Sequence, residues 1–83
     1  MTRLGLGCLQ VMHLRNINNI VDAKTIKELL KIEDISKFFE YQSLYRTLTS
    51  LIDSGLVSYG AKDGKALTYY VTKKGIEIIK EYC

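Results

Sequence analysis

One segment, residues 41–54, separates apolar from polar side chains so completely that it constrains the fold more than any other feature of the chain. An α-helix turns by about 100° per residue, which places alternate sets of side chains on opposite sides. One side would carry Tyr41, Leu44, Tyr45, Leu48, Leu51 and Ile52. The other would carry Gln42, Ser43, Arg46, Thr47, Thr49, Ser50 and Asp53. The pattern predicts a helix packed on a core along one side, and Gly55 stands where such a helix ends through a left-handed residue.

A β-hairpin is predicted directly after this helix. Its strands would span residues 56–61 and 66–72, joined by Lys62-Asp63-Gly64-Lys65. An Asp-Gly pair between strand-like runs is a strong hairpin signal, because both central residues of the tight turn need a positive φ. The residues of the second strand that are expected to face the core are Leu67, Tyr69 and Val71.

Further helices are predicted on both sides of these elements. Residues 3–15 indicate a first helix, although the stretch 3–7 could instead be extended. Asp22 is expected to cap a second helix over residues 23–32, and Thr72 to cap a last helix over residues 73–82. The side chains expected to turn inward are Ile26, Leu29 and Leu30 from the second helix, and Ile76, Ile79 and Tyr82 from the last.

Two connecting segments are harder to assign. Residues 33–40 favour a short helical turn packed on the core, because Ile35, Phe38 and Phe39 all favour burial. Residues 16–20 form an asparagine-rich turn, and a short strand could follow it before the second helix.

Length and composition limit the class of protein. A chain of 83 residues without proline has no linker between two cores, so residues 1–83 are expected to form a single domain. The formal net charge of +3 permits nucleic-acid binding without requiring it. Cys8 and Cys83 form no disulfide framework, which fits the reducing cytoplasm, and no apolar run is long enough to span a membrane.

The order helix, helix, helix, strand, strand, helix predicts an α+β, mainly α, winged helix-turn-helix with three helices, a β-hairpin wing and a C-terminal helix. A DNA major groove is about 12 Å wide and admits one α-helix. The polar side of residues 41–54 would present hydroxyls suited to phosphates, while Gln42 and Arg46 carry the donors and acceptors that base edges require. Only Asp53, at the far end, would repel a duplex. An ordinary solvated face could look similar, but the hairpin that follows favours double-stranded DNA as the partner.

Four lysines are expected to meet phosphates beside this helix. Lys62 and Lys65 flank the hairpin turn, while Lys24 and Lys27 would begin the second helix, whose free backbone amides also favour an anion. The predicted DNA-binding residues are Gln42, Ser43, Arg46, Thr47, Ser50, Lys62, Lys65, Lys24 and Lys27.

The stretch from Ser43 to Val57, followed by Tyr69 to Gly75, resembles the C-terminal half of PadR-like winged-helix regulators and the broader MarR-like group. In these families Leu-x-x-Leu-x-x-x-Gly-Leu-Val ends the recognition helix, and Tyr-x-Val-Thr-x-x-Gly ends the wing. The resemblance implies that the protein is a dimer and that DNA is contacted by Gln42, Ser43, Arg46 and Thr47. The long C-terminal helices of many relatives are missing, so a homodimer would use the first helix, the last helix or both.

Three functions are compatible with these features. The first is a transcriptional regulator of a prokaryote, plasmid or phage that recognises a specific sequence. The second is a DNA-binding accessory protein of plasmid replication or conjugative transfer, and the third is a winged helix used only for protein contacts. No enzymatic activity, cofactor or metal is expected, because His13 is the only histidine and no phosphate-binding glycine motif occurs.

Overall fold

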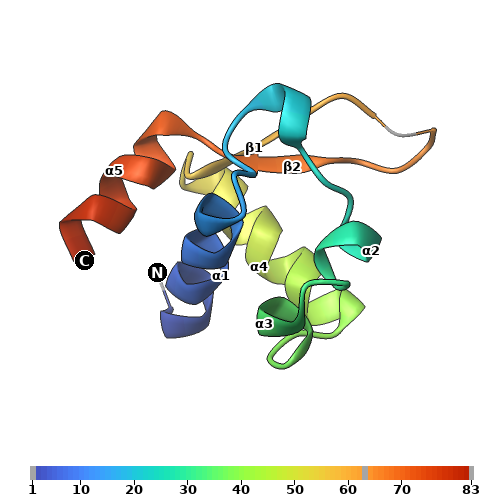
Figure 1. Cartoon of the computed structure of the whole chain (residues 1–83), viewed down its shortest axis with the longest axis horizontal. Coiled ribbons are helices and arrows are strands. Elements are labelled where there is room, and N and C mark those ends of the chain that lie inside the picture. The colour runs from blue at the N-terminus through green and yellow to red at the C-terminus, as the bar shows by residue number, and fades with distance from the viewer. Residues whose placement is uncertain (1, 63, 83) are drawn as a thin grey trace.

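Five α-helices, a 3-10 helix and a two-stranded hairpin make up the part of the chain that the computed structural model describes, residues 2–62 and 64–82. In chain order (Figure 1) they are α1 (Arg3–Leu14), η1 (Ile20–Asp22), α2 (Ile26–Leu29), α3 (Glu33–Ser36), α4 (Tyr41–Asp53), β1 (Val57–Tyr59), β2 (Tyr69–Val71) and α5 (Lys73–Tyr82). The predicted first, third and last helices and the hairpin are therefore confirmed, and residues 3–7 are helical.

The core lies between the helices and one face of the hairpin. α1 contacts α3, α4, α5 and β2, and α4 contacts α2 and β1. Side chains without solvent exposure come from nearly every element; they include Leu9, Met12, Leu29, Ile35, Leu44, Leu48 and Val71. Because these residues are contributed by segments far apart in the sequence, burial of their apolar surface is what holds the short helices in place.

The hairpin is joined by a third, very short extended segment. β1 and β2 are antiparallel, with Val57 opposite Val71 and Tyr59 opposite Tyr69. On the other edge of β2, the Lys24 amide donates to the Tyr69 carbonyl at 3.0 Å, and the Tyr69 amide donates to the Lys24 carbonyl at 2.8 Å. The strand considered before the second helix is thus present as a single bridge.

The second helix is shorter than predicted, and its cap is different. Asp22 belongs to η1, which Asn19 caps, and residue 24 is extended. α2 begins after Thr25, whose hydroxyl accepts from the Glu28 amide at 3.2 Å, while the Glu28 carboxylate accepts from the Thr25 amide at 3.0 Å. This reciprocal capping box outcompetes an Asp22 cap because it satisfies two backbone amides at once.

Several apolar side chains lie nearer to solvent than predicted. Ile35 and Phe39 are buried, but Phe38 points outward and is 64% exposed, because neighbouring residues of one helical turn cannot face the core together. Leu67 is exposed because β2 begins only at Tyr69 and the core-facing alternation does not reach residue 67. Tyr82, in the last turn of α5, is also exposed.

The hairpin turn is wider than a two-residue Asp-Gly turn. Both strands are shorter than expected, and the last backbone bond between them that borders the loop runs from the Gly60 amide to the Thr68 carbonyl at 2.9 Å. Gly64 has φ +64°, in the left-handed region expected of a turn glycine. Asp63, the other residue of the predicted turn, lies outside the described residues.

The start of α5 contacts the segment that follows α4 through the Thr72 hydroxyl and the close approach of Gly75. The Thr72 hydroxyl donates to the Gly55 carbonyl at 2.7 Å and accepts from the Gly75 amide at 3.1 Å, so the predicted cap is confirmed. A Cβ at Gly75 would collide with the Leu56 carbonyl oxygen. Gly55 itself ends α4 with φ +77°, as predicted.

Replacing Thr72 with alanine should lower the free energy of unfolding by about 0.5–2 kcal/mol, the usual effect of losing a helix N-cap. Equilibrium urea unfolding followed by circular dichroism measures this change. Thr72→Ser keeps the hydroxyl and serves as the matched control, with a smaller expected loss. Equal losses in the two variants would contradict the role of the hydroxyl.

Candidate nucleic-acid interface

The polar side of α4 is open to solvent for most of its length. On the opposite side Leu44, Leu48 and Leu51 are buried and fix the helix against the core. Of the strip predicted from the sequence, Thr47 is half-buried and four side chains are exposed: Gln42, Ser43, Arg46 and Ser50. A helix held on one side and free on the other meets the mechanical requirement for insertion into a groove.

The first turn of α4 limits what Ser43 can do. The Glu40 amide donates to the Ser43 hydroxyl oxygen at 2.8 Å, and the Ser43 hydroxyl donates to the Glu40 carbonyl at 3.1 Å. The hydroxyl proton is therefore already used in capping the helix. Glu40 also places an exposed carboxylate beside the strip, which the helical pattern of residues 41–54 does not include because this residue precedes the helix.

The second half of the strip borders the first turn of α1. Arg46, Thr47 and Ser50 line a groove of about 490 Å³ whose other wall includes Thr2 and Gly5. Thr2 is the N-cap of α1 and accepts from the Gly5 amide at 3.0 Å. The strip thus continues into a polar groove between the two helices.

The first half of the strip borders two tyrosines that were predicted to face the core. Tyr41 and Tyr45 are 52% and 49% exposed, and they line a hollow of about 440 Å³ together with Gln42 and Arg46. The prediction that they pack inward was wrong because periodicity treats tyrosine as apolar, whereas its ring can pack while its hydroxyl remains in water.

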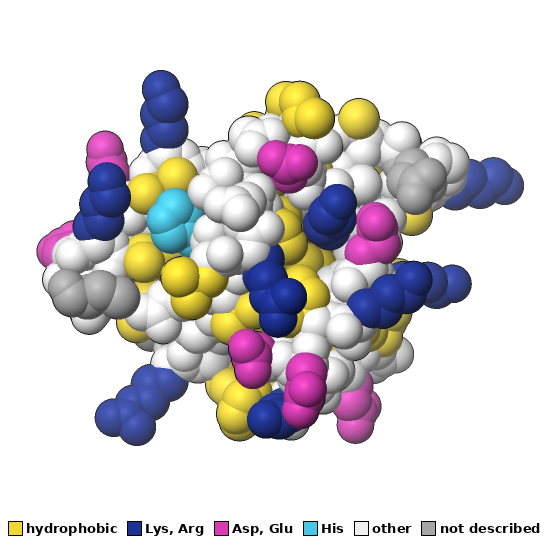
Figure 2. All heavy atoms as spheres, in the orientation of Figure 1, with side chains coloured by type: hydrophobic (Ala, Val, Ile, Leu, Met, Phe, Trp, Pro, Cys, Tyr) yellow, Lys and Arg dark blue, Asp and Glu magenta, His cyan; other side chains and the backbone are white. Residues whose placement is uncertain are grey.

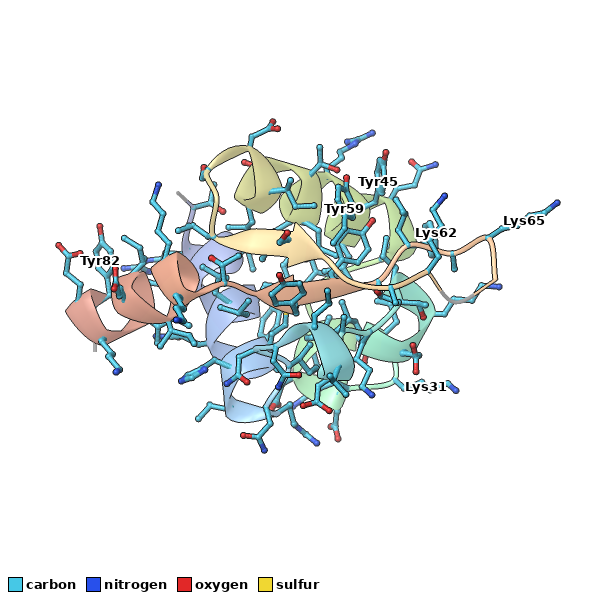
Figure 3. All side chains as sticks on the ribbon, turned by 90° about the horizontal axis from the view of Figure 1, so that it is seen from above. Lys31, Tyr45, Tyr59, Lys62, Lys65 and Tyr82 are labelled. Carbon is cyan, nitrogen blue, oxygen red and sulfur yellow. The ribbon has the colours of Figure 1, made fainter. Side chains whose placement is uncertain are left out.

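The lysines divide between two sides of the molecule. Lys27 and Lys65 line a pocket of about 280 Å³ together with Tyr41 and Tyr45, and so adjoin the α4 strip. Lys62 is exposed near Lys65 at the far end of the hairpin, and Figure 3 shows both beyond Tyr45 and Tyr59. Lys24 instead lines a separate hollow with Arg15, Glu28 and Lys31.

The start of α2 differs from the start of the predicted second helix. The Thr25 and Glu28 amides are bonded within the Thr25–Glu28 capping box. The Thr25 amide holds the pKa of Glu28 below its ordinary value. Partial burial opposes this shift, and the Thr25 hydroxyl, Lys24 and Lys31 add smaller contributions that lower the pKa further. A carboxylate that stays ionised at this position would repel a phosphate.

The face that carries α1 and α2 differs in charge from the α4 side. Figure 2 shows carboxylates interspersed among the lysine and arginine side chains over this face. By contrast, no aspartate or glutamate is among the described residues that line the three hollows along α4. The hollows along α4 therefore favour a polyanion more than the α1 and α2 face does, although the exposed carboxylates of Glu40 and Asp53 lie at the two ends of the helix.

Other reactive side chains offer little chemistry. Burial raises the pKa of the Cys8 thiol to about 12, which keeps it protonated and unreactive. His13 Nδ1 lies 3.0 Å from the Asn18 amide nitrogen. Within residues 2–62 and 64–82 no three histidine, cysteine, aspartate or glutamate side chains gather closely enough to hold a metal, and none of the helices has the length and hydropathy needed for a bilayer crossing.

Two solved structures match the chain over nearly its whole length. One is a candidate DNA-binding protein of Ralstonia eutropha JMP134, with a TM-score of 0.73 and 17% identity, covering 99% of this chain and 96% of that one. The other is the DNA-binding TubR fragment of Clostridium botulinum, with a TM-score of 0.73 and 23% identity, covering 100% and 99%. The chain has a winged-helix fold. In this winged helix α4 directly precedes the β1–β2 hairpin, which forms the wing.

Sequence comparison gives no closer assignment. No protein-family model matches the chain, and no curated protein is significantly similar to it. The resemblance to PadR-like and MarR-like regulators is therefore supported at the level of the fold, and membership of either group stays a prediction.

Proposed function

We propose that this winged helix binds double-stranded DNA sequence-specifically, as a small transcriptional regulator of a prokaryote, plasmid or phage. The observation that carries the proposal is the exposed side of α4, which carries no carboxylate between Glu40 before its first turn and Asp53 at its end, and which buried leucines hold from behind. The names of both structural neighbours, which refer to DNA binding, support the same class of partner.

In this proposal, the chemistry of each side chain along α4 decides whether it contacts base edges or phosphates. Gln42 and Arg46 are exposed and share one hollow, so they are assigned to base edges. Thr47 and Ser50, farther along the strip, suit phosphate oxygens or bridging water. Ser43 contributes mainly by capping the helix, and Lys27, Lys62 and Lys65 supply positive charge from the wing side.

Two copies of the chain would bind a DNA site made of two half-sites related by two-fold symmetry. A dimer places two recognition helices in successive major grooves, about 34 Å apart. α1 is a candidate for the contact between copies, since Leu4 and Leu14 are exposed on it, and α5 is the alternative. Sedimentation of the protein alone and with DNA would give the number of copies in each state.

Selection of bound fragments from a random DNA pool, followed by sequencing and gel shifts, tests the proposed function. A recurring, two-fold-related sequence is the expected result. An accessory protein of replication or transfer would use the same surface, and its selected sequence would occur at an origin rather than at promoters. Failure to bind any duplex even at low salt would refute the proposal and favour a winged helix used for protein contacts.

Replacing Lys62 or Lys65 with alanine should weaken binding to all DNA sequences alike. Each lost phosphate contact should reduce the slope of log K against log salt concentration by about 0.9. Fluorescence anisotropy titrations at several salt concentrations measure the slope. Lys31→Ala is the matched control, because Lys31 is exposed on the opposite side of the hairpin from Tyr45 (Figure 3), and its slope should equal that of the wild type.

A further inference from the structure

Tyr41 and Tyr45 lie on the surface between α4 and the wing, and no DNA contact has yet been assigned to them. If α4 enters a major groove and the wing reaches the adjacent minor groove, one sugar-phosphate backbone must pass between them, because a single backbone separates two neighbouring grooves. The side chains that line this surface would then face that backbone. This step rests on the proposed function.

Tyr41 and Tyr45 form this surface. Both line the hollow that contains Gln42 and Arg46, and both line the pocket that contains Lys27 and Lys65. The two tyrosines therefore connect the strip on α4 with the lysines near the wing. Without them the predicted contacts would form two separate patches.

The hairpin contributes a tyrosine to the same pocket. Tyr69 is buried and lines the pocket with Tyr41 and Tyr45, and the Tyr59 ring lies 5.5 Å from the Tyr69 ring, centroid to centroid. Burial raises the pKa of Tyr69, and nearby Tyr59, Tyr45 and Tyr41 raise it further, which places the four phenols in one cluster. Half of each α4 tyrosine is thus packed, while the other half is open to solvent.

The chemistry of the pocket fits a phosphate. A phenol hydroxyl donates a hydrogen bond, and Lys27 and Lys65 supply two positive charges at the pocket rim. Thr25 is the only other described lining residue with a polar side chain besides the tyrosines and lysines, and its hydroxyl accepts from Glu28. We propose that Tyr41 and Tyr45 donate hydrogen bonds to successive phosphates of the DNA strand that passes between α4 and the wing.

Tyr41→Phe and Tyr45→Phe remove only the hydroxyl and test this proposal. Each should raise Kd about tenfold, the order expected for a hydrogen bond to a charged group. The increase should be the same on selected and on unrelated DNA, since phosphates carry no sequence information. The salt slope should not change, because no charge is lost, which distinguishes these variants from the lysine variants.

Tyr82→Phe is the matched control. Tyr82 is exposed at the far end of α5, well away from Lys62 and Lys65 (Figure 3), and its variant should bind DNA like the wild type. A second measurement replaces single phosphates with neutral methylphosphonates. At the contacted linkage this change should weaken the wild type but not further weaken Tyr45→Phe.

The outcomes separate this inference from the function on which it rests. Unchanged Kd in both tyrosine variants, with tight binding by the wild type, would overturn the phosphate contacts and leave DNA binding intact. If Tyr82→Phe raised Kd as much as Tyr41→Phe or Tyr45→Phe does, the phosphate contacts would also be overturned, since the effect would not be local. No binding by the wild type would refute the proposed function itself.

Discussion

Replacing Leu48 with alanine should lower the free energy of unfolding by about 2–5 kcal/mol, the range for a leucine deleted from a closed core. Leu48 has no solvent exposure and lies midway along the buried side of α4. α4 packs against α1, α2 and β1, and these elements cannot all move into a gap left in a close-packed core. Because small domains unfold with only about 5–15 kcal/mol, a large share of the stability would be lost.

Leu14→Ala is the control for this variant. Leu14 is the last residue of α1 and is 79% exposed, so the same chemical change there removes little buried surface. Its expected effect is within about 0.5 kcal/mol. Thermal and urea unfolding of both variants at low protein concentration give the comparison. Similar losses at the two positions would mean that α4 is not anchored through Leu48.

The elements predicted best are those whose signal is carried by many residues at once. In residues 41–54 about a dozen positions follow the same helical pattern of polar and apolar side chains, and α4 spans Tyr41–Asp53. The last helix is equally well predicted, since the Thr72 hydroxyl caps its start locally by accepting from the Gly75 amide. Both cases depend on neighbours in sequence, which a single sequence contains.

The errors occur where a distant contact decides the conformation. Lys24 looked like a helix residue, but its backbone pairs with Tyr69 across the fold, and this extended pairing delays α2 until Thr25. The hairpin turn is wider than its Asp-Gly signal suggested because the paired strands stop at Tyr59 and Tyr69. Competition between local and long-range bonds cannot be read from residue spacing.

The sequence predicted which residues of the candidate site face outward, but not which of them lie next to one another on the surface. Periodicity placed Gln42 and Arg46 on the outer side correctly. It could not place Lys24 in a hollow with Glu28, because the long-range pairing of Lys24 with Tyr69 is not visible in residue spacing. Nor could it leave Tyr41 and Tyr45 at the surface, because they line a pocket with residues of the hairpin. The exposure of Tyr41 and Tyr45 could have been suggested by one signal, the presence of tyrosine at the edge of an amphipathic helix.

Replacing Arg46 with alanine should weaken binding to the selected DNA site by about 1–3 kcal/mol, or roughly 5- to 150-fold in Kd, and should relax the base preference at one position. Arg46 lines both the groove beside α1 and the hollow beside Tyr45, so it lies at the middle of the exposed strip. Among the described residues the ion pair is between Lys37 and Glu33, so Arg46 is not held by a carboxylate there. Its guanidinium can therefore bind a guanine with two hydrogen bonds.

Arg15→Ala separates recognition by Arg46 from the general effect of losing a positive charge. Arg15 is exposed and lines the hollow that contains Lys24 and Lys31, on the side where carboxylates are interspersed. Anisotropy titrations on the selected site and on unrelated DNA should give a large, site-specific loss for Arg46→Ala and almost none for Arg15→Ala. If Arg46→Ala instead weakens both DNAs equally, the guanidinium contacts phosphate, and base recognition must be assigned to Gln42 and the remaining side chains of α4.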